Sequence, residues 1–314
     1  MLKAGGNLTG MMLMTGAVML FAGQDTTAKW LLGSGLAIMQ VAFVRYLGHL
    51  AVTLAAVLPK QGFSALRSIN PKLQVLRSLA LLGSTALNFV GLSYLPLTTV
   101  TAIMFASPVL VTLLAVPMLG ERVGAMQFAA ILLGFAGVLI VVAPWNAEFH
   151  PAMLFSLAAC CCTSFYFIFS RKLAAESTAT QQIWASGIAT ICLAPFAFAQ
   201  WQTPSSLTIV LLMCLIGVIG GMSHSLVTLA HRIADASVLA PVVYLQLLFA
   251  SIAGYLVFGQ VPGASTLLGA LVIISGGILL WLSGRRRRIA AIRTSAIAVS
   301  AQQSDPNLGK KEER

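Results

Sequence analysis

The chain has 314 residues, of which 58% are hydrophobic and only 9% are charged, and its formal net charge is +11. Soluble domains are about 45–50% apolar and about 25% charged, whereas the mean hydropathy of this chain is +0.92. This composition excludes a soluble globular enzyme, a disordered chain and a free nucleic-acid binder. Long apolar stretches recur along the sequence, which indicates a protein whose surface faces a lipid bilayer.

Ten apolar segments follow one another along the chain. Each has the length of about 20 residues that a helix needs to cross about 30 Å of hydrocarbon, and barrel strands would instead alternate in segments of about 10 residues. The predicted fold is therefore an all-α polytopic membrane protein with ten transmembrane helices. The predicted spans are residues 8–31, 34–58, 73–94, 97–119, 123–143, 151–170, 181–200, 207–229, 236–258 and 264–283.

The basic residues predict an orientation. With the N-terminus inside, almost all Lys and Arg fall on the inner side, Lys29 falls outside and Arg45 lies within a span. Because cytoplasmic loops carry the excess of Lys and Arg, we expect both termini to be cytoplasmic, in a multi-pass protein of the bacterial inner membrane. The tail at 285–314 begins with an Arg run, and we expect it to be mobile, with that run at the lipid headgroups.

Two stretches that lie 139 residues apart resemble one another, so that Gly120 falls on Gly259 and Gly137 on Gly276. With five spans in each half, the second copy enters the membrane from the opposite side. Such inverted repeats are typical of secondary transporters, which bind substrate between the halves near the midplane. The predicted units are a first five-helix repeat at 8–145, a second at 150–284, and the tail at 285–314.

These residues resemble the drug/metabolite transporter superfamily, in particular its EamA-type members. The resemblance rests on Leu119-Gly120-Glu121 followed by a Gly-rich span, on a mid-span proline in Phe105-Ala106-Ser107-Pro108, and on the start of the ninth span at 230–237. It covers residues 10 to 284, and it implies an inner-membrane carrier of small metabolites. Gln260 departs from the pattern, because many members carry Glu at that position.

The resemblance leaves the substrate open. The second-half runs at 244–246 and 254–259 look most like the riboflavin-uptake and S-adenosylmethionine-uptake branches. Riboflavin uptake is the first expectation, and S-adenosylmethionine uptake or amino-acid or nucleobase efflux are the alternatives. Further partners are expected to be the bilayer and no nucleic acid, in a monomer or a homodimer.

A membrane-embedded enzyme is the alternative class of function. The sequence has no metal-type His cluster, no Ser/His/Asp set, no paired carboxylates and no phosphate-binding Gly-rich Lys loop. The five cysteines all lie in apolar segments, without metal spacing. We therefore predict no catalytic residue, no metal and no cofactor.

Ionisable residues inside a membrane are costly and are candidates for function. Arg45 lies within the second span and His49 follows one turn later on the same face, which predicts contact with a substrate anion or a gate. The alternative is a buried Arg that binds helix-end carbonyls or a carboxylate. His224 lies mid-span, as a packing residue or as a contact for substrate or protons.

Asp25 and Lys29 are spaced for an ion pair at the outer mouth, with a structural or gating role, and Asp25 with Arg45 is the alternative pair. Aromatic and polar side chains suit a flat ring such as a flavin or a purine. The predicted substrate path is completed by Asn88, Trp184, Tyr244 and Gln246.

Overall fold

The computed structural model describes residues 2–120, 124–143, 149–234, 239–279 and 281–282. Within these ranges every regular element is a helix, as the apolar segments predict. The predictions for the tail at 285–314 and for Glu121 fall outside the described residues.

The two halves of the chain form similar successions of helices. The first half forms α1 (Leu2–Gly33), α2 (Ile38–Gln61), the short 3-10 helix η1 (Gly62–Leu66), α3 (Pro71–Tyr94), α4 (Leu97–Met104), α5 (Ser107–Leu119) and α6 (Ala125–Val142). The second half forms α7 (Ala152–Lys172), α8 (Thr178–Ala199), α9 (Leu207–Ile233), the short η2 (Ala240–Tyr244), α11 (Leu245–Phe258) and a helix at Ala264–Leu279.

Short polar residues begin several of these helices. The side chains of Asn70, Ser177 and Ser206 accept a hydrogen bond from the backbone three residues later, at the starts of α3, α8 and α9. Such caps satisfy backbone N–H groups that have no partner in the first turn. Asn70, Ser177 and Ser206 therefore fix where α3, α8 and α9 begin.

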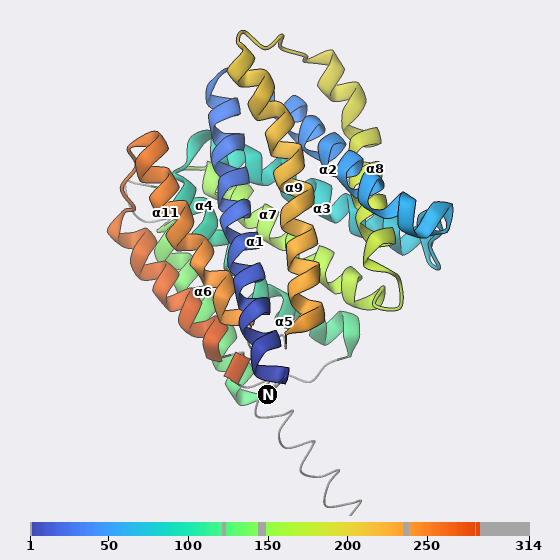
Figure 1. Ribbon diagram of the computed structural model, residues 1–314. Coiled ribbons are helices and arrows are strands. Elements are labelled where there is room, and N and C mark those ends of the chain that lie inside the picture. Colours follow the sequence, from blue (N-terminus) through green and yellow to red (C-terminus); the bar gives the residue numbers. More distant parts are fainter. Residues whose placement is uncertain (1, 121–123, 144–148, 235–238, 280, 283–314) are drawn as a thin grey trace, which may run out of the picture.

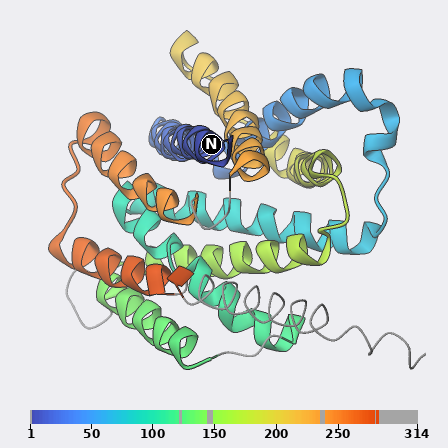
Figure 2. The same cartoon turned by 60° about the horizontal axis from the view of Figure 1, so that its bottom comes forward.

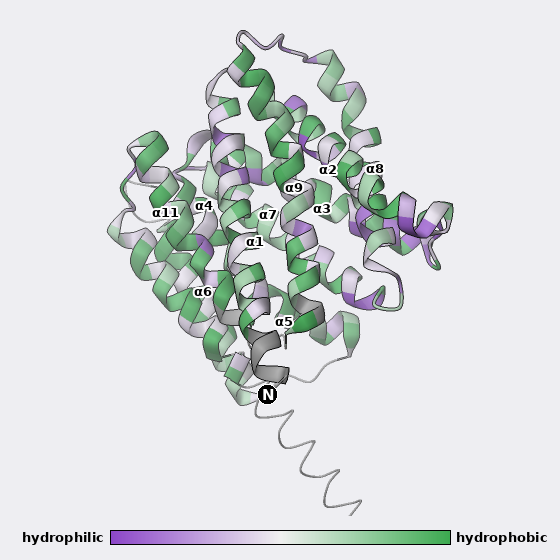
Figure 3. Ribbon diagram, viewed as in Figure 1, coloured by the Kyte–Doolittle hydropathy of each residue, from purple (hydrophilic) through white to green (hydrophobic). Residues whose placement is uncertain are grey.

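Within the described residues, six helical spans are long and apolar enough to cross a bilayer by length and composition, and α4 and α5 together form one of them. Three shorter apolar helices lie within α6, across η2 and α11, and at Ala264–Leu279. Many large apolar residues along the helices are exposed. In Figure 3 the helices are mostly coloured as hydrophobic, while hydrophilic residues gather around η1 and the connection to α3. The chain is therefore a polytopic membrane protein, because a surface so apolar is stable only against lipid.

The predicted span at 97–119 is present as one apolar span, and its helix is interrupted between α4 and α5. Pro108 has no N–H to donate to the carbonyl of Met104, one turn earlier, and the Ser107 hydroxyl donates to that carbonyl instead at 2.8 Å. The chain turns through Phe105 and Ala106, and α5 begins at Ser107. The same point 139 residues later is the junction between η2 and α11.

The helices pack in pairs that combine the two halves of the chain. In Figure 1, α1 and α9 lie side by side, and in Figure 2, α3 and α7 run alongside one another beneath them. α2 packs against both α8 and α9. Gly48 and Gly217 allow this close approach, because a Cβ built on Gly48 would lie 2.6 Å from the Cα of Gly217.

Equivalent glycines of the two halves have equivalent roles. Gly120 and Gly259 end α5 and α11 in left-handed conformations, with φ of 69° and 65°. A Cβ on Gly137 would lie 2.8 Å from the Gly269 carbonyl, and a Cβ on Gly276 would lie 3.0 Å from the Ala130 carbonyl. α6 and the helix at Ala264–Leu279 therefore cross at their backbones, where only small residues fit.

Candidate functional site

Four helices bring polar side chains together away from their ends. The central polar cluster comprises Gln24 and Asp25 of α1, Arg45 and His49 of α2, Thr85 and Asn88 of α3, and His224 of α9. Gln24, Arg45 and His49 are 4%, 5% and 2% exposed. Because α1 to α3 belong to one half of the chain and α9 to the other, the cluster lies where the halves meet.

Arg45 is held by the residue that follows it and by α3. Its Nη1 donates to the Thr85 hydroxyl at 3.1 Å, and its guanidinium lies over the Tyr46 ring, 4.6 Å from the centroid. The Tyr46 hydroxyl lies 2.7 Å from the Thr85 hydroxyl and donates to the Leu81 carbonyl at 3.1 Å. The cost of burying this cation is thus offset by a hydrogen bond and by a ring face.

His49 and His224 meet as a pair of stacked rings. Their centroids are 5.1 Å apart and their planes differ by 8°, and Phe21 of α1 meets His224 edge-on at 5.2 Å. Neither ring nitrogen of His49 has a hydrogen-bond partner among the described residues. The pair therefore combines a flat aromatic surface with unused hydrogen-bonding groups.

Asp25 and Gln24 bring a carboxylate and an amide to the cluster. The Asn88 amide reaches the Asp25 carboxylate at 3.5 Å, and the charge of Arg45 acts on Asp25. Gly220 of α9 makes room for Gln24 and Arg45, because a Cβ there would lie 3.1 Å from Gln24 Oε1 and 3.9 Å from Arg45 Cγ. An acidic and a basic side chain are therefore present in the same cluster.

Several polar atoms of the cluster are buried and have no partner within the described part of the chain. They are Gln24 Oε1, Arg45 Nε, both ring nitrogens of His49 and Asn88 Oδ1. A buried polar group without a hydrogen bond costs about 1–3 kcal/mol. Such groups in one cluster are typical of a ligand site, where the ligand supplies the partners.

Lys29 binds the end of a helix. Its ammonium donates to the carbonyls of Leu92 and Leu95 at 2.8 and 2.6 Å, and it lies 5.6 Å from the centroid of the Phe258 ring. The last carbonyls of α3 have no helical partner and attract a cation. The contacts of Lys29 are thus to carbonyls rather than to Asp25, and a gating role of the two residues stays a prediction.

Three other predicted path residues lie outside the central polar cluster. The Trp184 indole donates to the Leu66 carbonyl at 2.9 Å, so it anchors η1 to α8. The Tyr244 ring meets Phe105 edge-on at 5.3 Å, at the break between α4 and α5. Gln246 lies in the first turn of α11.

The sequence pattern does not predict Gln24 and Thr85 of the central polar cluster, nor Tyr46, which contacts Thr85 and Arg45 beside it. Each is uncharged and of a type common in such helices, so composition gives no signal for them. Tyr46 adjoins Arg45, and its complete burial is a property of the packed structure. When a sequence places an Arg within a span, the hydroxyl residues of the neighbouring span are candidates for its hydrogen-bond partners.

A separate set of hydrogen bonds connects two loops at the end of α2. Glu176, between α7 and α8, accepts from the Ser68 hydroxyl at 2.6 Å, from the Asn70 backbone at 3.0 Å and from the Gln74 amide at 2.7 Å. Burial opposes ionisation of Glu176, but these hydrogen bonds outweigh it and hold its pKa below the usual value. We call Ser68, Asn70, Gln74 and Glu176 the loop clasp.

Arg77 reinforces the same side of the molecule. Its three nitrogens donate to the Ser170 hydroxyl at 2.7 Å, to the Gln181 carbonyl at 2.9 Å and to the Tyr166 hydroxyl at 2.9 Å. α3 is therefore held to both α7 and α8. Every nitrogen of this buried Arg has a partner, in contrast to Arg45.

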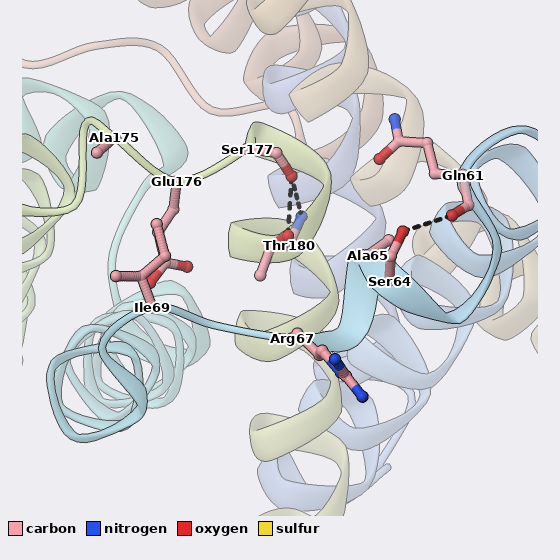
Figure 4. A pocket seen from close by; sticks show the side chains of 9 residues that line it. All are labelled: Gln61, Ser64, Ala65, Arg67, Ile69, Ala175, Glu176, Ser177 and Thr180. Atoms are coloured by element: carbon pink, nitrogen blue, oxygen red, sulfur yellow. Dashed lines mark hydrogen bonds between the residues drawn. The ribbon is translucent and has the colours of Figure 1, made fainter.

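A groove of about 270 Å³ lies beside the loop clasp (Figure 4). Its lining comes from the end of α2, from η1 and from the residues before and at the start of α8. It is lined by Gln61, Ser64, Ala65, Arg67, Ile69, Ala175, Glu176, Ser177 and Thr180. No residue of the central polar cluster lines it, so the groove and the cluster are different places.

Comparisons with known proteins identify the family. The model of the EamA-like transporter family matches residues 8–143 and 150–282. The S-adenosylmethionine uptake transporter of Rickettsia prowazekii is 31% identical, over 83% of this chain and 88% of its own. The riboflavin transporter of Rhizobium johnstonii is 30% identical, over 73% of this chain and 76% of its own.

A solved crystal structure has the same fold. It superposes with a TM-score of 0.63 at 20% sequence identity, and the match covers 90% of this chain and 99% of that chain. With both parts of the sequence matched by the family model, this chain belongs to the EamA-like transporter family of the drug/metabolite transporter superfamily.

Proposed function

We propose that the chain is a secondary transporter of ten transmembrane helices, built as two inverted five-helix repeats at 8–145 and 150–284. The left-handed caps at Gly120 and Gly259 support the repeat, as do the reciprocal contacts of Gly137 and Gly276. Five helices per repeat invert the second copy. Both termini are then cytoplasmic, as the Lys and Arg distribution favours.

The substrate site in this proposal is the central polar cluster, with Arg45, His49, Asn88 and His224 in contact with substrate. It lies between the halves, and the halves rock about it to open to one side and then the other. The loop clasp belongs to the cytoplasmic side, and Lys29 and Asp25 to the outer side. A solute gradient drives the movement, as in other secondary transporters.

S-adenosylmethionine is the proposed substrate. The observation that carries this choice is that Asp25 and Arg45 belong to one cluster, where the printed hydrogen bond of each goes to an uncharged side chain: Arg45 donates to Thr85, and the Asn88 amide donates to Asp25. S-adenosylmethionine carries a carboxylate together with a positively charged amino group and sulfonium, so both side chains would find a partner of opposite charge. A relative that is 31% identical is named for uptake of this compound.

Riboflavin is the second candidate. The parallel rings of His49 and His224 offer a face on which a flat ring can stack, and a relative that is 30% identical is named for riboflavin transport. Riboflavin has no ionised group at neutral pH, so it would offer neither Asp25 nor Arg45 a partner of opposite charge. Riboflavin is therefore the second candidate, because it does not match the charged side chains of the cluster.

Uptake by whole cells tests the proposal. Bacteria that cannot import S-adenosylmethionine are given this gene, and entry of the labelled compound is measured beside that of labelled riboflavin. We expect uptake of S-adenosylmethionine that is lost in Arg45→Ala and kept in Thr112→Val, a change at an exposed hydroxyl that bonds only to its own helix.

The abundance of each variant in the membrane is measured by immunoblot. Uptake of riboflavin alone would reverse the ranking of the two substrates. Failure of both compounds to enter, with the protein present in the membrane, would refute the import of either.

A further inference from the structure

The hydrogen bonds around Arg45 have one possible direction. The Tyr46 hydroxyl has a single hydrogen, and the Leu81 carbonyl that it contacts at 3.1 Å can only accept. Thr85 must therefore donate to Tyr46 across their 2.7 Å contact, and its oxygen accepts from Arg45 Nη1 at 3.1 Å. The relay runs from Arg45 to Thr85, then to Tyr46, and ends at Leu81.

This relay determines how the guanidinium is placed. Thr85 holds the Nη1 corner, and the Tyr46 ring at 4.6 Å supports the planar group from one face. A guanidinium is rigid and planar, so one fixed corner and one supported face leave it little freedom to rotate. Tyr46 is completely buried and Thr85 is 7% exposed, so both are themselves held by packing.

The relay leaves one edge of the guanidinium available. Nε–H and one N–H of Nη2 point in the same direction, on the side opposite the Nη1 corner. Nε is buried and has no partner among the described residues, and the hydrogen bond from the guanidinium to Thr85 goes through Nη1. Two parallel N–H groups match the two oxygens of a carboxylate, which is the strongest pairing that Arg makes.

We propose that the Nε and Nη2 edge of Arg45 binds the carboxylate of an amino-acid-like substrate, and that Thr85 and Tyr46 are the positioning residues that aim this edge. The inference rests on the proposed function, because it assigns the carboxylate end of S-adenosylmethionine to that same site. Asp25 faces the cationic end of the substrate. Arg45 is only 5% exposed in this structure, so the carboxylate reaches it when the helices separate.

A pair of ligands that differ in the carboxylate tests the proposal. Purified protein in detergent is titrated with S-adenosylmethionine and with its decarboxylated form, and binding is measured as the rise in melting temperature and by direct titration. We expect the wild-type protein to bind the carboxylate form at least about tenfold more tightly, as for loss of a charged hydrogen-bonded pair.

Variants then separate positioning from general structure. Thr85→Val and Tyr46→Phe remove the relay, so we expect the preference for the carboxylate form to fall about fivefold or more, with little change for the decarboxylated form. Thr85→Ser keeps the hydroxyl and is expected to retain the preference. Thr112→Val is the matched control for loss of a threonine hydroxyl.

The outcomes distinguish this inference from the proposed function. Tight binding of the carboxylate form without uptake by cells would refute S-adenosylmethionine transport and keep the carboxylate site. Equal binding of the two ligands by wild-type protein would refute the carboxylate site. Binding of neither would refute both, and an unchanged preference in both Thr85→Val and Tyr46→Phe would refute the positioning roles.

Discussion

His224 and His49 stack with their ring centroids 5.1 Å apart, and they bring α9 and α2 together inside the membrane. Phe21 meets His224 from the side at 5.2 Å, so three helices share this contact. An aromatic pair contributes about 0.5–1.5 kcal/mol beyond the burial of its area. The imidazole of His224 is therefore a structural element as well as a predicted substrate contact.

Replacing His224 separates these two roles. His224→Ala removes both ring contacts, so we expect a lower melting temperature in detergent, whereas His224→Phe keeps an aromatic ring and is expected to retain most of the stability. His150→Ala is the control, because His150 stacks on Tyr94 at 5.7 Å but is exposed. Equal melting temperatures for His224→Ala and His150→Ala would contradict the structural role.

Lys29 is expected to stabilise the end of α3. Lys29→Met removes two hydrogen bonds from a charged donor, each worth about 1.5–3 kcal/mol when buried, and partial exposure of Lys29 reduces this. We expect a clear fall in the free energy of unfolding, measured by denaturant titration in detergent. Lys72→Met is the matched control at an exposed site, and an equal fall there would show that Lys29 has no special role.

Replacing either of the two glycines that have a left-handed backbone is expected to cost a similar amount of stability. Gly120→Ala and Gly259→Ala place a Cβ at φ of 69° and 65°, and each is expected to lower stability by about 1–2 kcal/mol. Gly33→Ala is the control, because Gly33 lies in α1 without a positive φ and a Cβ there would meet open space. Equal melting temperatures for all three variants would contradict the conclusion that Gly120 and Gly259 require a left-handed backbone.

The loop clasp predicts a dependence of stability on pH. The pKa of Glu176 is lower in the folded protein than the value of about 4.3 in an unfolded chain. Its contribution is therefore complete above about pH 4.3 and is lost as the pH falls through the lowered pKa. Glu176→Gln has no carboxylate to titrate, so we expect it to be less stable at pH 7 and to lose less stability on acidification.

A second variant tests the cause of that shift. Ser68→Ala removes one of the hydrogen bonds to the carboxylate, so the pKa of Glu176 should rise and the loss of stability should begin at a higher pH. The melting temperature is recorded from pH 7 down to pH 3 for both variants and for the wild type. Parallel curves for wild type and Glu176→Gln would exclude Glu176 as the titrating group.

Much of the fold follows from local properties of the sequence. Apolar length predicts a spanning helix, and Asn70, Ser177 and Ser206 begin helices because their side chains are suited to capping. The break within 97–119 does not follow from Pro108 alone, because a proline in a helix can produce a kink or a complete turn. The hydroxyl of Ser107 decides the outcome, through a bond that depends on the folded geometry.

The sequence predicts those members of the central polar cluster whose charge is costly to bury. Arg45 and His224 stood out because ionisable residues are rare within spans, and they are joined through His49 and Gly220 as neighbours of one cluster. Trp184 is predicted on the path because aromatic residues often line pockets, and its indole donates to the Leu66 carbonyl, outside the central polar cluster. Which face of α8 turns inward depends on contacts between helices distant in sequence.

The turn between α4 and α5 also affects how this span can move. In a continuous helix a change of angle at one point stretches hydrogen bonds that belong to the helix itself. In this span the Met104 carbonyl is already bound to the Ser107 side chain, which can follow a rotation by turning about a single bond. Bending at Phe105 and Ala106 therefore costs the span little of its own hydrogen bonding, whereas the contacts of Ser107 with Cys160 and Ser164 of α7 limit how far the two pieces can tilt.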